Sequence, residues 1–324
     1  MLLWEIDRPL RQLSEAYGFE RAARAYRASL DAVAGLQTLV AQLGIACDMR
    51  AMNSLYLASE ESNASLREEH RYRTRAGLPG AFLDHAMLLD NFGIARAGAL
   101  VSPGAADSDP LQLSLGLLRA AAARGARLFE AEAIAFDAAG SSVQVGLAND
   151  REIEARAVVL ATGYVMPDIV RSSVHEVSSS WAIATPPQPE KLWNDRTLIW
   201  EDANDYLYAR TTHAGRIIIG GEDSTETVEP EARDRLIPAK ARVLAQRLAA
   251  LWPVANTDIE FRWAGTFDTT TDGLPLIGPV AGAKGVYAAY GYGGNGITFS
   301  FLAACLIGDL IAAAVSEERL QWAS

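Results

Sequence analysis

The chain has 324 residues but little cysteine, little histidine and no excess of positive charge. Its two cysteines, Cys47 and Cys305, are too few for a disulfide framework, and their apolar neighbours predict reduced core residues in a reducing compartment. The four histidines show no metal-ligand spacing, so no metal site is expected. The net charge of −11 disfavours nucleic acid or an anionic membrane surface as a partner, because both attract basic patches.

A targeting segment is not expected either. Residues 1–7 lack the basic region and the long apolar core of a signal peptide, and we expect a cytoplasmic protein. One long apolar run covers residues 297–315, but Asp309 interrupts it and no basic flank follows it. This run is therefore predicted to be a buried helix, and no membrane span is expected.

Half of the residues are apolar and 21% are charged, as in a folded enzyme of one large or two ordinary domains. Apolar spacings of three and four predict helices at residues 10–46, 110–124 and 230–251, and a charged helix at 60–76 whose charges are interpreted as a solvated face. Strands are expected at residues 53–59, 127–137, 143–147, 152–160, 174–184, 198–201, 206–211, 216–220, 259–266 and 285–290. Parallel-type βα pieces thus flank antiparallel blocks, which favours a mixed α/β fold with two domains.

The first motif with chemical meaning is Val158-Val159-Leu160-Ala161-Thr162-Gly163. Its apolar half is expected to be a buried central strand. The small residue, the hydroxyl and the glycine that follow allow a tight turn and a close approach of the backbone to a ligand at the carboxyl end of a sheet. A plain strand-ending turn is the alternative.

The second motif is Gly291-Tyr292-Gly293-Gly294-Asn295-Gly296, here called the glycine cluster, which has the G-x-G-x-x-G spacing. A dinucleotide fingerprint needs a following strand with an acidic end, whereas residues 297–324 form one apolar helix. A glycine-rich turn at a helix N-terminus exposes backbone N–H groups to an anion or another electron-rich group. A tight turn that packs under a sheet is the alternative.

Three segments in this order resemble a known family: Ala161-Thr162-Gly163, then Asp272-Gly273-Leu274-Pro275-Leu276-Ile277-Gly278, then the glycine cluster with Ile297-Thr298. They resemble the FAD-dependent oxidoreductases of the D-amino-acid oxidase and glycine oxidase type, the DAO family. The resemblance implies a flavin-binding domain (residues 1–48, 108–165 and 263–324) interleaved with an antiparallel substrate domain (49–107 and 166–262). It also implies oxidation of a C–N bond in a small amine or amino acid by hydride transfer to FAD.

The same resemblance assigns the cofactor-binding residues. Ile134 would lie by the adenine, Ala161 to Gly163 would pass the diphosphate and ribityl region, and the glycine cluster would line the flavin ring. The full expected set is Ile134, Ala161, Thr162, Gly163, Asp272, Gly273, Pro275, Gly291, Gly293, Gly294, Asn295, Gly296, Ile297 and Thr298.

The sequence departs from the family pattern in two ways. No strand with a G-x-G-x-x-G turn lies near residue 1, so the unit that binds the ADP half of FAD is expected to be missing. Where relatives clamp a substrate carboxylate with arginine, this chain has Phe267 and Gly293-Gly294, which favours amines over α-amino acids. The alternative function is a truncated or flavin-less member, with FAD absent or weakly bound, that acts as a non-catalytic fragment or a partner subunit.

The substrate-side candidates come from one β segment. Alternation places Tyr206, Tyr208 and Arg210 on one face, and the resemblance matches Tyr206 to a tyrosine near the substrate. We therefore expect Tyr206 and Arg210 to be the catalytic residues, with a polar outer sheet face as the alternative. Arg262 is either a site cation or part of a surface ion pair. A homo-oligomer or a partner subunit is compatible with the sequence.

Overall fold

The computed structural model describes residues 1–58, 62–140, 142–170, 172–203 and 205–322, with side chains described up to residue 314. In this part of the chain the largest element is a mixed sheet of eight strands in the order β12-β8-β11-β10-β9-β1-β3-β2. Only the pair β1 and β9 is parallel. The strands are β1 (Arg50–Leu57), β2 (Ala81–Asp84), β3 (Gly98–Asp107), β8 (His175–Ala184), β9 (Leu198–Glu201), β10 (Leu207–Thr211), β11 (Ile217–Ser224) and β12 (Phe261–Thr270).

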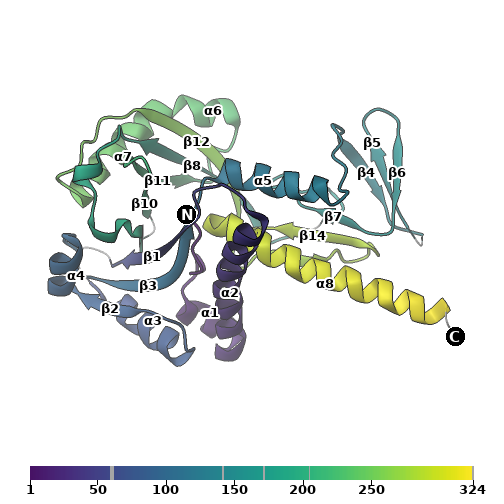
Figure 1. Ribbon diagram of the computed structural model, residues 1–324, viewed down its shortest axis with the longest axis horizontal. Coiled ribbons are helices and arrows are strands. Elements are labelled where there is room, and N and C mark those ends of the chain that lie inside the picture. The colour runs from purple at the N-terminus through teal and green to yellow at the C-terminus, as the bar shows by residue number, and fades with distance from the viewer. Residues whose placement is uncertain (59–61, 141, 171, 204, 323–324) are drawn as a thin grey trace.

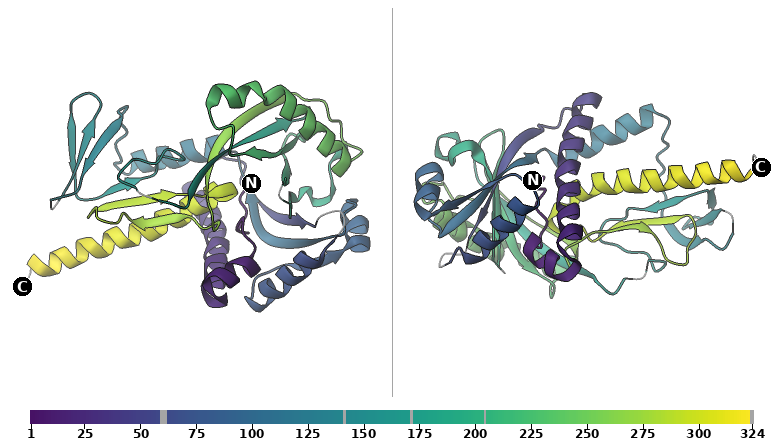
Figure 2. Two further views of the ribbon diagram at one scale, coloured as in Figure 1. Left: turned by 180° about the vertical axis from the view of Figure 1, so that it is seen from behind. Right: turned by 90° about the horizontal axis from the view of Figure 1, so that it is seen from below.

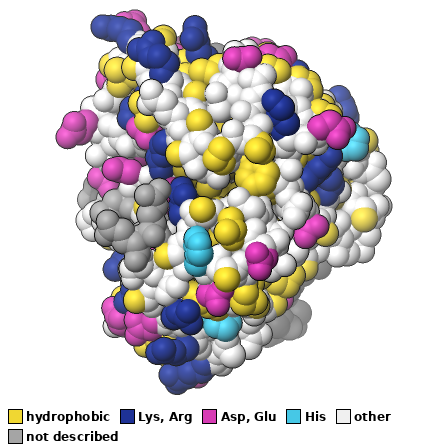
Figure 3. Space-filling view, turned by 90° about the vertical axis from the view of Figure 1, so that its left-hand side faces the viewer, with side chains coloured by type: hydrophobic (Ala, Val, Ile, Leu, Met, Phe, Trp, Pro, Cys, Tyr) yellow, Lys and Arg dark blue, Asp and Glu magenta, His cyan; other side chains and the backbone are white. Residues whose placement is uncertain are grey.

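The eight-stranded sheet buries one face under helices. Ile217 and Ile219 alternate inward from β11, as expected for a strand with one covered face. They pack with Leu244 and Leu248 of α7 (Ile237–Leu251) in the largest apolar cluster. Helices α4 (His85–Phe92) and α6 (Pro230–Arg235) lie around the same part of the molecule (Figure 1). On the face in Figure 3, basic and acidic side chains are interspersed, so neither sign forms a continuous field there.

A second group of elements extends from the middle of Figure 1, where α1 and α2 lie, to its right-hand side. Strands β13 (Leu276–Pro279), β14 (Val286–Tyr290) and β7 (Val158–Leu160) form one sheet, and β4 (Ala133–Asp137), β5 (Val143–Leu147) and β6 (Glu152–Ala155) form another. Helices α1 (Leu10–Tyr17), α2 (Phe19–Leu43), α5 (Pro110–Ala123) and α8 (Gly296–Trp322) accompany them. Helix α2 approaches α8 closely, because a Cβ added to Gly35 would lie 2.7 Å from the ring of Phe301.

Helix α8 is less buried than the sequence predicts. It leaves the body of the molecule and runs outward in both views of Figure 2. The segment Gly293–Ala314 is long and apolar enough to cross a membrane by length and composition alone. Only 22% of its most apolar stretch is buried. Phe299, Ala303 and Ile307, spaced by four, pack inward, whereas Cys305 is exposed. The prediction of a buried helix is therefore wrong for most of α8, and the prediction that Cys305 is a core residue is also wrong.

The charged helix α3 (Ala64–Arg75) is not a purely solvated face. Residues 60 and 61 of the expected helix, with residue 59 of the expected strand before it, lie outside the described residues. Glu69 and Arg73 are each 2% exposed. Arg73 Nε donates to Glu69 Oε1 at 2.8 Å, and the Glu69 carboxylate accepts the backbone N–H groups of Leu10 and Arg11 at 2.9 Å each. Two of the charges are buried because they pair with each other and cap the start of α1.

Three further expectations change. Strand β7 lies at the edge of its sheet, paired only with β14, and Val159 is 45% exposed, so the predicted buried central strand is wrong in the described structure. The expected strand at 127–137 is restricted to β4. The expected domain boundary at residue 263 falls inside β12, which pairs with β8 along its whole length. Residues 263–270 thus belong to the eight-stranded sheet, while the two-domain division remains a prediction.

Candidate active site

Two of the cavities in the described structure share walls formed by Asp7, Trp200, Tyr206 and Phe267. The aromatic cavity, about 340 Å³, is lined by these residues together with Tyr208, Arg210, Trp263 and the segment 293–295. The acidic cavity, about 600 Å³, is lined by the shared residues together with Tyr56, Glu201, Asp202 and Asp223. The combined space lies between the eight-stranded sheet and the glycine cluster.

The predicted face of Tyr206, Tyr208 and Arg210 points into the aromatic cavity and is not an outer sheet face. The rings of Tyr206 and Tyr208 are 6.5 Å apart. Burial raises the pKa of both tyrosines, which keeps their hydroxyl groups protonated. A Cβ on Gly220 would lie 2.2 Å from the hydroxyl oxygen of Tyr208, so only glycine at position 220 leaves room for the Tyr208 side chain.

The two arginine candidates behave differently. Arg210 lines the aromatic cavity, and its guanidinium lies 3.8 Å from the buried carboxylate of Asp107. Burial lowers the pKa of Arg210, and the charge of Asp107 opposes this effect. Arg262 is exposed and lines neither cavity. Trp263 and Gly265 of the same strand line the aromatic cavity, and alternation along the strand directs the Arg262 side chain to the opposite face.

The glycine cluster contacts an acidic residue that the sequence did not single out. Gly294 N donates to Asp7 at 2.7 Å, and Asn295 Nδ2 donates to Asp7 at 3.0 Å. Gly293 has φ +58°, and a Cβ there would lie 2.0 Å from an Asp7 oxygen. Burial raises the pKa of Asp7 to about 6, while the hydrogen bond from Gly294 opposes the rise. Asp7 is an exposed residue by its accessible surface, and it lines both cavities.

The two glycine-containing turns begin at the same edge of one sheet. Strands β7 and β14 are parallel neighbours, so Ala161-Thr162-Gly163 and the glycine cluster both follow carboxyl ends there. Thr162 Oγ1 and the Tyr290 hydroxyl are 2.7 Å apart and share a hydrogen bond. Ala161 to Gly163 are exposed, and a Cβ added to Gly296 would meet open space. Open α/β sheets bind ligands at such an edge.

Other predicted cofactor residues contact the protein itself. Asp272 accepts hydrogen bonds from Thr270 Oγ1 and Leu274 N at 3.0 Å each, and also from the hydroxyl of Tyr17. The adjacent Gly273 packs on Arg8, and the half-buried Pro275 completes this turn.

Thr298 and Ile297 hold the first residues of the chain against α8. Thr298 is fully buried and donates to the carbonyl of Leu3 at 2.8 Å, while Ile297 packs in the helical core cluster. Ile134, on the separate sheet of β4, is 62% exposed and lines neither cavity. The structure thus brings part of the predicted set together around one edge and leaves Ile134 apart from the two cavities.

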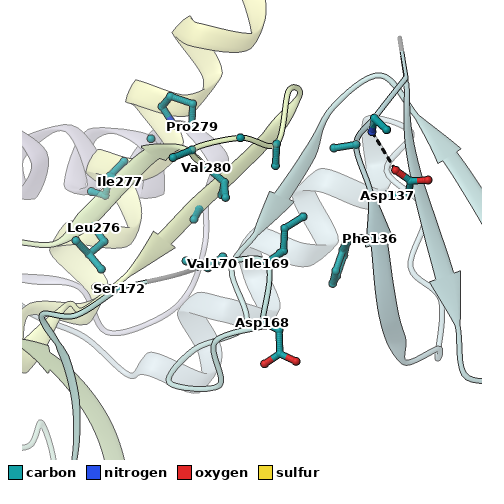
Figure 4. A pocket seen from close by; sticks show the side chains of 17 residues that line it. Phe136, Asp137, Asp168, Ile169, Val170, Ser172, Leu276, Ile277, Pro279 and Val280 are labelled. Carbon is teal, nitrogen blue, oxygen red and sulfur yellow. Dashed lines mark hydrogen bonds between the residues drawn. The ribbon is translucent and has the colours of Figure 1, made fainter.

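A larger cavity of about 800 Å³ lies elsewhere, between β4 and the β13–β14 hairpin (Figure 4). It is lined mainly by residues 136–139, 168–170, 172 and 276–283, and by none of the predicted site residues. In the figure Phe136 and Ile169 point into the space between these elements. Size alone therefore does not identify the active site. The aromatic cavity is the better candidate, because it is lined by Tyr206, Arg210 and part of the glycine cluster, and the acidic cavity adjoins it.

Comparison with known proteins identifies the family. The family model described as FAD dependent oxidoreductase, DAO, matches residues 7–310, and the chain belongs to this family. It is 25% identical to gamma-glutamylputrescine oxidoreductase of Escherichia coli, over 94% of this chain and 72% of that protein. It is 28% identical to a glycine oxidase of Geobacillus kaustophilus, over 67% of this chain and 56% of that protein.

Solved structures agree with this family. The glycine oxidase from Geobacillus kaustophilus superposes with a TM-score of 0.77 at 25% identity, covering 89% of this chain and 79% of that one. L-proline dehydrogenase from P. horikoshii gives the same TM-score of 0.77 at 18% identity, covering 90% and 79%, and thus shares the fold. The mixed α/β fold expected from the sequence is confirmed. The chain is an FAD-dependent oxidoreductase of the amine or amino-acid oxidase kind.

FAD, the cofactor of this family, fits the residues at the shared edge of β7 and β14. Two turns with little side-chain bulk leave their backbone accessible, and the open space at Gly296 lies at the start of a long helix. A helix N-terminus stabilises electron-rich groups through its unpaired N–H groups and its dipole.

Proposed function

We propose that this protein oxidises a C–N bond in a small amine or amino acid, with FAD as the hydride acceptor. The observation that supports this best is the aromatic cavity, which is lined by Tyr206 and Arg210 together with residues 293–295 of the glycine cluster. FAD, when bound, supplies the redox chemistry and accepts the hydride. The residues that would hold it are Ala161, Thr162 and Gly163 at the end of β7 and Gly291 to Gly296 at the end of β14.

The chain's own side chains would orient the substrate and exclude water from it. Tyr206 is held by its hydroxyl, which donates to Asp223 at 2.6 Å. Trp200, Trp263 and Phe267 supply apolar walls around the reacting carbon. A neutral amine is the form that gives up a hydride, so the substrate must lose a proton in this cavity, and Asp7 is the carboxylate closest to the glycine cluster.

The missing carboxylate clamp favours an amine substrate. Phe267, Gly293 and Gly294, which line the cavity where relatives have arginines, carry no charge, and Arg262 points away from the cavity. Arg210 remains, but Asp107 already lies 3.8 Å from its guanidinium. Of the two relatives, one is named for an amine derivative and the other for an amino acid. We propose that the substrate of this chain is an amine and not an α-amino acid.

The proposal is tested by titrating the purified chain with FAD and following the quenching of flavin fluorescence. The bound flavin is then mixed anaerobically with butylamine or with the matched amino acid norvaline, and the loss of visible flavin absorbance is recorded. We expect FAD to bind and butylamine to reduce it at least as fast as norvaline. Failure of FAD to bind, or of both compounds to reduce it, would contradict the proposal and favour a non-catalytic subunit.

A matched pair of variants locates the flavin. Gly296→Val fills the open space at the start of α8, whereas Gly308→Val changes an exposed glycine later in the same helix, also with open space beside it. We expect the first variant to lose FAD binding and the second to keep it. Equal FAD binding by both variants would remove the glycine cluster from the cofactor site.

A further inference from the structure

We propose that the substrate has a second positive charge, remote from the reacting amine, and that the acidic cavity binds it. This inference rests on the proposed amine oxidation and names the substrate class as a linear diamine. One amine would lie in the aromatic cavity and the other in the acidic cavity, which share the walls formed by Asp7, Trp200 and Tyr206.

Three of the four carboxylates that line the acidic cavity, those of Asp7, Asp202 and Asp223, form no ion pair with a lysine or arginine of the described residues. Among the described residues, Asp202 accepts from two hydroxyl groups, those of Tyr56 at 2.8 Å and Ser65 at 2.6 Å. Asp223 accepts from the Tyr206 hydroxyl through one oxygen, and its other oxygen is buried without a hydrogen-bond partner among the described residues.

Glu201, in the same cavity, shows the contrast. Its carboxylate is neutralised by Arg96 at 3.2 Å and by Arg247 at 3.0 Å. The excess negative charge therefore resides on the three aspartates and not on every acid in the cavity. Burial raises the pKa of Asp223, although the hydroxyl groups of Tyr206 and Ser180 and the charge of Lys240 oppose the rise. A bound cation would oppose this rise further.

A second observation also points to a ligand that donates hydrogen bonds. Asn295 is 3% exposed and is one of the residues that line the aromatic cavity, and its buried Oδ1 has no hydrogen-bond partner among the described residues. Its Nδ2 is already used by Glu5 and Asp7. Ammonium groups have three donors and no acceptor, so they complement such unpaired oxygens.

The aromatic walls suit the same ligand. Trp200 lines both cavities and stacks on Tyr56 with ring centroids 3.7 Å apart. Aromatic faces attract cations and also pack against the methylene chain between two amines. Trp200 Nε1 also has no hydrogen-bond partner among the described residues. It is a donor, whereas the unpaired atoms of Asp223 and Asn295 are acceptors. A ligand with an anionic end in the acidic cavity would instead face three like charges.

The test measures binding by isothermal titration, independently of flavin chemistry. Diaminobutane, butylamine and aminobutanoate have the same carbon chain and differ at one end. We expect diaminobutane to bind about tenfold more tightly than butylamine, which corresponds to about 1.4 kcal/mol, and aminobutanoate to bind most weakly. Equal binding of the diamine and the monoamine would overturn the inference.

Matched variants assign the effect to the cavity. Asp202→Asn and Asp223→Asn keep the shape and remove one charge each, whereas Asp90→Asn removes an exposed charge on α4 that lines neither cavity. We expect the diamine preference to fall several-fold in the first two variants and to persist in the third. Circular dichroism with a urea titration confirms folding, and a folded Asp202→Asn/Asp223→Asn double variant with an unchanged preference contradicts the inference.

The two proposals fail in different ways. Diamine binding without flavin reduction would refute the proposed oxidation and leave the acidic cavity as a diamine site. Flavin reduction by amines with no preference for the diamine would support the oxidation and refute the second binding site.

Discussion

The buried charges around Arg73 allow a quantitative prediction. Arg73 has 2% exposure and is the cation shared by two buried carboxylates, Glu69 at 2.8 Å and Glu5 at 3.7 Å. Its guanidinium also lies 5.5 Å from the centroid of the Trp4 ring and 5.7 Å from that of Tyr26. Replacing it with methionine keeps most of the volume and leaves both carboxylates buried without a cation.

The expected loss of stability follows from this geometry. Removing one partner of a buried ion pair costs about 3–5 kcal/mol, because the remaining charge is desolvated and unpaired. That is a large part of the roughly 5–15 kcal/mol by which domains are stable. Helix α1 should be destabilised as well, because Glu69 accepts from the first N–H groups of α1 and Pro9 offers no side-chain acceptor for them.

The assay is urea unfolding followed by circular dichroism, with the free energy of unfolding compared between variants. Arg71→Met on the exposed face of α3 is the control and should change the value by no more than about 0.5 kcal/mol. Glu69→Gln should be destabilising too, but the two changes together should cost less than their sum because they remove one interaction. A loss below about 1 kcal/mol for Arg73→Met would refute the argument.

Three further predictions concern the site and α8. Gly293 has φ +58°, and the Cβ of an alanine there would lie 2.0 Å from an Asp7 oxygen. Gly293→Ala should therefore displace Asp7 and weaken FAD binding in a fluorescence titration, whereas Gly308→Ala should leave FAD binding unchanged. The folded-state pKa of Asp7, about 6, lies above its ordinary value of 3.8, so its contribution to stability is present below pH 3.8 and is lost as pH rises through about 6. Asp7→Asn should reduce this decline in urea titrations at successive pH values, and an unchanged decline would refute the assignment. Cys305 should react with a thiol reagent in the folded protein and Cys47 only after unfolding, and equal rates would contradict the described exposure.

Features set by neighbouring residues were predicted from the sequence. Helix α5 begins at Pro110 as predicted, because Asp109 caps its first N–H groups. The helix expected over residues 10–46 is divided at Gly18, where the backbone has φ +82°. The shared face of Tyr206, Tyr208 and Arg210 follows from strand alternation. In each case the interacting groups lie within a few positions of one another, so local geometry determines the result.

The tertiary structure decided which of these features meet and which are covered. Asp7 and Gly294 are 287 positions apart, and neither has a pattern that indicates the contact between them. The burial of Glu69 depends on the start of α1, and the exposure of Cys305 depends on which face of α8 meets α2 and the β13–β14 sheet. Periodicity shows that a helix has an apolar side, but only packing against distant segments shows whether that side is covered. The sequence thus determined the local elements and the family motifs, whereas the charge balance of the two cavities arises only when distant acids fold into one space.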